Sequence, residues 1–228
     1  MRPLFTILLS LLFCTSILSQ NEIGVGINGG VNIPVGNFHK YYSIGYSGDA
    51  QILYNVNNAF ILVLTSGYHL WKVDEDAYNK RANELAQNQK YNFDSHFRIV
   101  PIYLGIRYFL GRGKHRPFFS LDFGGYAYEF KISGIINSTL PNANTIPINI
   151  PETKKTDTQT ALAVGFGYFY NLSKNWNVEV HSKYTVLSSG YVINEPDKIV
   201  TPDGATTDYG SAKKLNFISI SAGINYIF

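Results

Sequence analysis

Residues suited to acid–base chemistry stand close together near position 180. Glu179 and His181 are two positions apart in a segment whose apolar and polar residues alternate. A histidine beside a carboxylate can act as a general base toward a serine hydroxyl. The nearest serines are Ser182, on the opposite face of an alternating segment, and Ser188, at its end. A base must reach its nucleophile within about 3 Å, which this spacing does not ensure, so a hydrolase remains a hypothesis without an assigned nucleophile.

Further ionisable side chains occupy the polar face of other alternating segments. We expect them to point into one shared interior, where acids and bases neutralise each other through ion pairs and hydrogen bonds. The predicted polar network consists of Asp49, Arg98, Arg107, Asp122, Glu129, Glu179, His181 and Lys183, with His69 beside them. This mixture predicts a filled interior, and no cofactor is expected.

A second group of acids begins the segment after residue 73. Asp74, Glu75 and Asp76 precede the stretch 77–86, which favours a helix. Because acids at a helix N-terminus interact favourably with the helix dipole, a short helix is predicted here. The alternative is a calcium loop, but the acids lack its alternating ligand spacing and its turn glycine.

The first residues have the composition of a secretory signal peptide. An early positive charge is followed by an apolar run that ends at Phe13, too short for a spanning helix of about 20 residues. Cleavage is expected after Ser19, which gives a signal peptide at 1–19 and one domain at 20–228. The only cysteine, Cys14, follows a bulky residue where a lipoprotein signal needs a small one. The mature chain then has no disulfide and no thiolate metal site.

The composition is aromatic and poor in charge. Aromatic and charged residues each make up 15% of the chain, with 17 Tyr and 15 Phe. Its 19 basic and 16 acidic residues are too balanced to favour nucleic acid as a partner. No segment after the leader has eighteen uninterrupted apolar residues, so entry into a membrane would require strands, and strands in lipid must close into a barrel.

Apolar residues recur with period two, which predicts strands rather than helices. We expect eight of them, each with one apolar and one polar or small-residue face. The expected strands are residues 22–33, 43–55, 59–72, 95–110, 117–131, 159–170, 175–188 and 214–228.

Two of these strands change parity along their length. The apolar positions shift near Val100-Pro101 in the fourth strand and at Gly124-Gly125 in the fifth. A β-bulge would shift the faces in this way, and proline or glycine tolerates one. We therefore predict a bulge at each site.

The connections alternate in length, and this predicts the topology. Short turns follow the second, fourth and sixth strands, at 57–58, 111–116 and 171–175, whereas the other connections are longer. Periplasmic turns and longer extracellular loops alternate in this way in outer-membrane barrels, and aromatic residues near strand ends fit their interfacial girdles. The predicted extracellular loops are 34–42, 73–94, 132–158 and 189–213.

A soluble calycin-like barrel is the competing interpretation. It would place the rows of Tyr and Ile inside and Glu179, His181 and Lys183 outside. It gives no reason for the closing alternation from Ile218 to the aromatic Phe228. We therefore predict an all-β, eight-stranded, antiparallel up-and-down transmembrane β-barrel with a filled polar lumen, in the bacterial outer membrane.

Several segments resemble the small outer-membrane β-barrel domain proteins of the PorT-like kind. The resemblance is carried by the leader ending at Ser19-Gln20, the strand from Val100 to Phe109, the glycine-rich Phe123-Gly124-Gly125-Tyr126 and Val164 to Tyr168, and the closing Ile224 to Phe228. It covers the whole mature chain. It implies the barrel-assembly machinery as a partner, with Tyr226 and Phe228 as the assembly signal.

The expected function follows from the size of the barrel. Eight strands leave an interior that side chains can fill, so an open pore is not expected. We predict a structural or surface-recognition role carried by the loops 73–94, 132–158 and 189–213, with outer-membrane lipid around the barrel and an extracellular or envelope protein as possible partner. The alternatives are a component of an envelope or secretion assembly and a lipid-modifying enzyme. Isoleucines in the third loop either pack together or form a docking surface: Ile135, Ile136, Ile146, Ile148 and Ile150.

Overall fold

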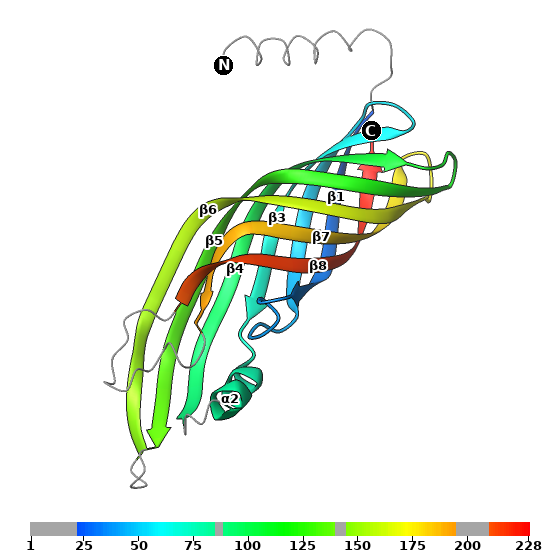
Figure 1. Ribbon diagram of the computed structural model, residues 1–228. Coiled ribbons are helices and arrows are strands. Elements are labelled where there is room, and N and C mark those ends of the chain that lie inside the picture. Colours follow the sequence, from blue (N-terminus) through cyan, green and yellow to red (C-terminus); the bar gives the residue numbers. More distant parts are fainter. Residues whose placement is uncertain (1–21, 85–88, 140–144, 195–209) are drawn as a thin grey trace, which may run out of the picture.

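The computed structural model describes residues 22–84, 89–139, 145–194 and 210–228. The expected leader at 1–19 and the Pro202-Asp203-Gly204 turn lie outside these residues. Eight antiparallel strands form a closed barrel in chain order, as predicted (Figure 1). The strands are β1 (Ile23–Val35), β2 (Gly45–Asn55), β3 (Phe60–Lys72), β4 (Gln89–Phe109), β5 (His115–Thr139), β6 (Thr145–Asn171), β7 (Trp176–Ile193) and β8 (Gly210–Ile227).

The barrel closes between its first and last strands. Backbone pairing runs from Gly24 opposite Ile227 to Val35 opposite Asn216. The amide of Phe228 donates to the carbonyl of Ile23 at 2.8 Å, one step beyond this ladder. Both ends of the barrel sequence therefore lie at the same end of the molecule, as the expected even strand number requires (Figure 1).

One apolar belt surrounds the outside of the barrel. Ile27, Ile102, Phe166 and Val180 are all more than half exposed, while the residues that alternate with them face inward. In water such a surface would be costly, whereas lipid solvates it. Among the described residues, no helix is both long enough and apolar enough to cross a membrane.

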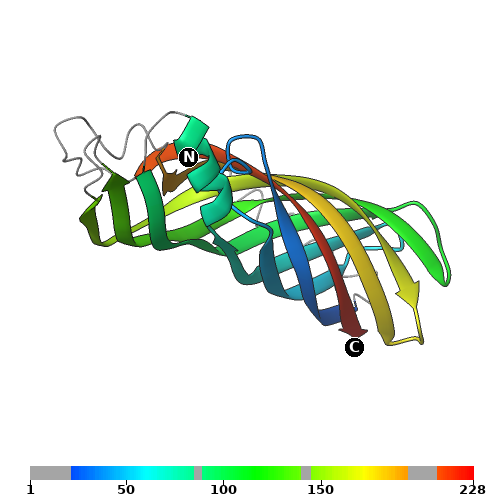
Figure 2. The ribbon, with the colours of Figure 1, turned by 90° about the horizontal axis from the view of Figure 1, so that it is seen from below.

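The one described helix lies where the acids predicted it. Helix α2 (Glu75–Glu84) follows β3, and Asp74 caps it because its Oδ1 accepts a hydrogen bond from the amide of Ala77 at 2.9 Å. Seen from below, α2 and the loop after β1 lie together at the end of the barrel opposite the short turns (Figure 2). Their contact includes Tyr41 and Tyr78, whose ring centroids are 5.0 Å apart.

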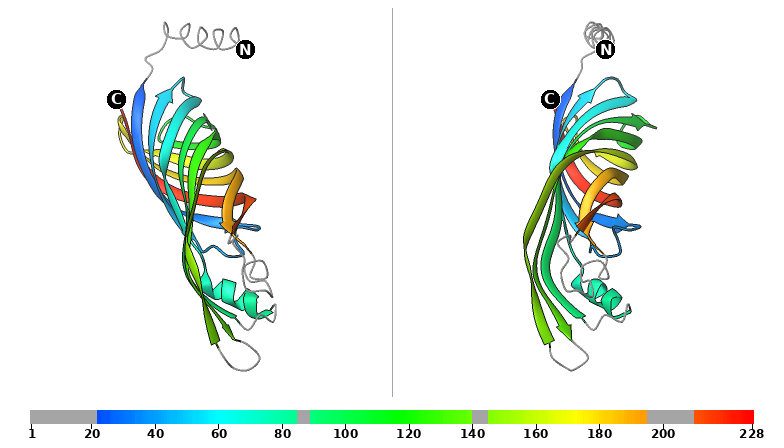
Figure 3. Two further views of the ribbon diagram at one scale, coloured as in Figure 1. Left: turned by 90° about the vertical axis from the view of Figure 1, so that its left-hand side faces the viewer. Right: turned by 60° about the vertical axis from the view of Figure 1, so that its left-hand side comes forward.

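The predicted third loop is wrong, because most of 132–158 is strand. β4, β5 and β6 have 21, 25 and 27 residues, against 13 in β1 and 11 in β2. Their excess length projects from the barrel as a three-stranded sheet, with α2 on its concave side (Figure 3). Ile136 and Ile150 are buried there and Ile135 is exposed, whereas the side chains of Ile146 and Ile148 lie outside the described part.

Both predicted bulges are also wrong. The pairing of β4 with β5 continues without a shift from Gln89 opposite Ser138 to Phe109 opposite Phe118. Register shifts occur elsewhere, between Ile132 and Gly134 in the pairing of β5 with β6 and between Leu187 and Gly190 in the pairing of β7 with β8. The apolar residues change from odd to even positions because aromatic side chains fill the interior at the end opposite the short turns. The backbone register does not shift there.

The interior is therefore layered rather than polar throughout. An apolar cluster at the end with the short turns contains Leu53, Ile61, Val63, Phe109, Phe118 and Phe169. A larger cluster, rich in aromatic rings, fills the opposite end. The predicted polar residues that face inward lie in the layer between the two.

We expect Val180→Arg to destabilise the barrel by about 2 to 4 kcal/mol, because Val180 lies near the middle of the apolar belt. Urea unfolding in lipid vesicles would measure the change, with Val180→Leu as the matched apolar control. An arginine variant as stable as the leucine variant would place Val180 away from lipid and contradict the assigned outer face.

Candidate functional site

The middle layer of the interior is built around one buried ion pair. Arg107 on β4 and Glu179 on β7 lie across the lumen, with Nη1 and Oε2 3.0 Å apart and both side chains 1% exposed. Gln51 on β2 joins them: its Oε1 accepts from Arg107 Nη2 at 2.7 Å and its Nε2 donates to Glu179 Oε2 at 2.9 Å. The guanidinium also lies over the rings of Phe118 and Phe169. This network ties three strands together at the centre of the barrel.

A serine and a histidine lie next to the carboxylate of this ion pair. Ser120 Oγ and His181 Nε2 are 2.8 Å apart, and His181 Nδ1 is 3.4 Å from Glu179 Oε1. Ser120 lies 61 residues before His181, so spacing along the chain could not identify it. The sequence did contain a signal that Ser120 faces the lumen, because it alternates in β5 with the outward-facing Phe119 and Leu121.

The surroundings of this group suit packing rather than turnover. Ser120, His181 and Glu179 are each less than a tenth exposed, and the ring of Phe118 lies 5.0 Å from that of His181. A polar cavity beside this layer has a volume of about 30 Å³, room for about one water molecule. It could not hold an acyl substrate.

Two further pairs extend the polar layer. His69 Nε2 lies 2.9 Å from Asp49 Oδ1, and Lys183 Nζ lies 3.0 Å from Asp122 Oδ2. Both pairs border the small cavity, through Asp49, His69 and Lys183. The structure thus gathers six of the eight network residues in the lumen: Asp49, Arg107, Asp122, Glu179, His181 and Lys183.

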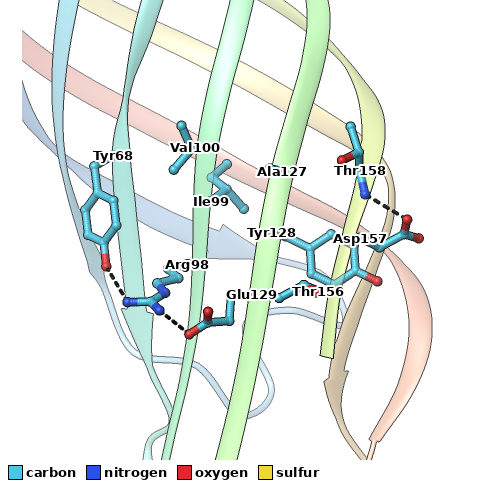
Figure 4. A pocket seen from close by; sticks show the side chains of 10 residues that line it. All are labelled: Tyr68, Arg98, Ile99, Val100, Ala127, Tyr128, Glu129, Thr156, Asp157 and Thr158. Atoms are coloured by element: carbon cyan, nitrogen blue, oxygen red, sulfur yellow. Dashed lines mark hydrogen bonds and ion pairs between the residues drawn. The ribbon is translucent and has the colours of Figure 1, made fainter. Parts of the chain in front are cut away.

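Arg98 and Glu129 were expected in the lumen but lie on the outer face. Because neither strand has the expected bulge, Arg98 alternates with the buried Phe97 and Ile99. It binds Glu129 on β5 through an ion pair and approaches the hydroxyl of Tyr68 at 3.5 Å. Figure 4 shows these side chains at the edge of a hollow of about 570 Å³ whose wall includes Val100 and Ala127.

Three basic side chains surround the carboxylate of Glu129, just above the apolar belt. Besides Arg98, Lys154 Nζ lies 2.6 Å from Oε2 and His96 Nε2 lies 3.8 Å from Oε1. The hydrogen bond from Arg98, and then that from Lys154, lower the pKa of Glu129 to about 2. Glu129 therefore stays ionised and holds β4, β5 and β6 together at the base of the projecting sheet.

Aromatic rings close the end of the lumen opposite the short turns. Phe38, in the loop after β1, packs against Trp71 and Phe97 with ring centroids 5.4 and 5.7 Å away. The hydroxyl of Tyr78 on α2 donates to the carbonyl of Asn194 at 2.6 Å. The loop and the helix thus cover the mouth of the barrel and pack on its core.

A family model described as "Outer membrane protein beta-barrel domain" matches residues 5–228. The chain belongs to this family. Together with the closed ring of strands and the apolar belt, the match places the protein in the bacterial outer membrane. No protein of curated function matches the chain by sequence.

Solved outer-membrane proteins share this fold at low sequence identity. OprG from Pseudomonas aeruginosa is 11% identical with a TM-score of 0.52, over 91% of this chain and 96% of that one. A major outer membrane protein from Thermus thermophilus is 12% identical with a TM-score of 0.50, over 90% and 99%. Neisserial surface protein A is 13% identical, with a TM-score of 0.47, over 90% and 97%.

A double-mutant cycle tests the central ion pair. Glu179→Leu leaves a buried, uncompensated guanidinium and should cost about 3 to 5 kcal/mol of unfolding free energy, whereas adding Arg107→Met should restore most of it. Ser120→Ala is the matched control and should cost only about 1 kcal/mol, the value of a lost hydrogen bond. Denaturant unfolding of the refolded barrels measures Glu179→Leu, Arg107→Met, the double variant and the control. A double variant as unstable as the sum of its single changes would show that the two charges are not coupled.

Proposed function

We propose that this barrel anchors a recognition surface outside the cell, and that the projecting sheet of β4–β6 is that surface. The observation that carries the proposal is the unequal pairing of β6. Within the described part of the chain, residues 145–160 of β6 pair with β5 alone, and pairing with β7 begins only at Ala161. A sheet needed only to cross the bilayer has no reason to extend so far past its neighbours.

The exposed parts of the projecting sheet define where a partner could bind. Its concave side is occupied, because Tyr78 and Ala82 of α2 are buried against it. Its convex side is open, and Ile135 there is 45% exposed. The convex side and the tip are therefore the proposed contact surface.

The free edge of β6 is protected against indiscriminate pairing. Pro147 and Pro151 cannot donate to a new strand, and Lys154 and Lys155 add charge. Nearer the barrel, the amide of Thr158 already donates to Asp157 Oδ1 at 2.7 Å. This edge therefore favours a specific partner over self-association.

The interior supports a role without transport or catalysis. Aromatic side chains from the loop after β1 and from the strands fill the upper lumen, and the ion pair of Arg107 with Glu179 fills the middle. Ser120 is 7% exposed, and the described cavity in the polar layer has a volume of only about 30 Å³. A lipid-modifying enzyme is therefore the weaker proposal.

The closing strand supports the barrel-assembly machinery as a partner. Phe228 is 68% exposed, and Tyr226 packs edge-on against Trp176 at 4.9 Å between ring centroids. Both aromatic side chains face outward, where a factor that binds the last strand could contact them. We include this machinery in the proposal.

Site-specific photo-crosslinking in intact cells tests the recognition surface. A photoreactive residue at Ile135 should form a protein adduct reproducibly, whereas the same residue at Lys174, in the exposed turn before β7, should not. An epitope inserted at 140–144 should be accessible to antibody on unpermeabilised cells. Lipid adducts alone at position 135, or an epitope reached only after permeabilisation, would contradict the proposal. A partner from the same envelope would favour an assembly role for the surface.

Deletion of Phe228 tests the assembly signal. The deletion should slow appearance of the heat-resistant folded form in the outer membrane, because the outward aromatic is lost while the β1–β8 ladder is kept. Pulse-chase labelling with gel mobility of boiled and unboiled samples measures the rate, and Phe228→Tyr serves as the control. Assembly at the wild-type rate without Phe228 would exclude it as the signal.

A further inference from the structure

Four basic side chains form a continuous row across the outer face of β3–β6. Lys72 is the Cα partner of His96, His96 of Lys131, and Lys131 of Lys154. His96 and Lys131 alternate with buried residues, and directly paired residues share a face, so all four lie on the outer face. We call these four residues the basic row.

The basic row is costly for the protein alone. Like charges at directly opposite positions destabilise a sheet. Diagonal partners compensate in part: Lys131 pairs with Glu152 at 2.9 Å and Lys154 with Glu129 at 2.6 Å. No carboxylate of a described residue lies within ion-pair distance of Lys72.

The neighbouring rows do not neutralise this charge. Arg98 and Glu129 lie in the row toward the membrane, and Asp94 and Glu152 lie on the far side. Counted together, the permanent cations are Lys72, Arg98, Lys131 and Lys154, and the acids are Asp94, Glu129 and Glu152. These outer rows keep one positive charge with His96 neutral and two when it is protonated, while Asp157 adds one negative charge at the hollow itself.

The position of the basic row relative to the apolar belt indicates which layer of the membrane it faces. On its membrane side lies the hollow of about 570 Å³, with Val100 and Ala127 in its wall (Figure 4). The next outward side chains on β4, Ile102 and Leu104, are about 60% exposed and belong to the apolar belt. The cations therefore lie at headgroup level and the hollow lies at the top of the acyl region.

We propose that the basic row and this hollow bind one outer-leaflet lipid with a phosphorylated headgroup. Its phosphate would accept hydrogen bonds from Lys131, Lys154 and Arg98, and the first part of an acyl chain would occupy the hollow beside Ala127. Free phosphate would account for the cations but not for a hollow walled by Val100 and Ala127 next to the apolar belt. This site lies at the membrane end of the same outer face, where Lys131 pairs with Lys154, and its binding of lipid does not depend on the proposed recognition of a protein.

Binding of lipid A to the full barrel in detergent tests the proposal. Bisphosphorylated lipid A should bind the unchanged protein and dephosphorylated lipid A should bind much more weakly. Lys131→Gln with Lys154→Gln should weaken binding about 10-fold or more, because the phosphate loses two charge-assisted hydrogen-bond donors. Lys114→Gln with Lys174→Gln, in the short turns at the opposite end, removes the same charge and should leave binding unchanged.

A second variant tests the hollow apart from the charge. Ala127→Trp fills it and should weaken lipid A binding while all cations remain. Heat-dependent gel mobility would verify that each variant is folded. The proposal would be overturned by equal loss in the two double variants, by unchanged binding in Ala127→Trp, or by full displacement with millimolar inorganic phosphate.

Discussion

Closure of the sheet between β1 and β8 is the constraint on which the other features depend. In lipid, a strand edge has no water to satisfy its amides and carbonyls, so the first and last strands must pair with each other. The pairing of Gly24 with Ile227, extended by the bond from Phe228 to Ile23, completes that ladder. Once the ring is closed, the parity of each residue decides whether it meets lipid or lumen. The apolar belt, the buried polar layer and the basic row are all consequences of that assignment.

Closure also creates the main energetic difficulty of the fold, because small-barrel interiors must be filled without water. The protein fills each end with apolar side chains and confines its ionisable groups to the middle. There Arg107 contacts Glu179, Gln51 and two aromatic rings, so its charge is paired and its planar faces are packed. Such a layer links distant strands and leaves little room for solutes. The same packing surrounds the Ser120–His181 pair, and Ser120 is 7% exposed.

The outer face was predictable from the sequence where the two faces differ in chemistry. In β2 and β7 apolar and polar residues alternate, so the strands and inward residues such as Asp49 and Glu179 could be predicted directly. In the upper parts of β4 and β5 both faces carry large apolar side chains, and aromatic identity does not distinguish lumen from lipid. Arg98 and Glu129 were misplaced for that reason. The projecting sheet was taken for a loop because its polar, proline-containing strands gain their stability from pairing and from α2, which local pattern does not reveal.

Single-channel recording in planar lipid bilayers tests most directly the central claim, a closed barrel with a filled lumen that serves as an anchor. The protein should first be shown to be folded by heat-dependent gel mobility. We then expect no stepwise conductance above the bare bilayer, because aromatic rings close one end of the lumen and the Arg107–Glu179 layer fills its middle. Reproducible, long-lived conductance steps from the folded protein would contradict the account and would indicate a transport pathway through the barrel.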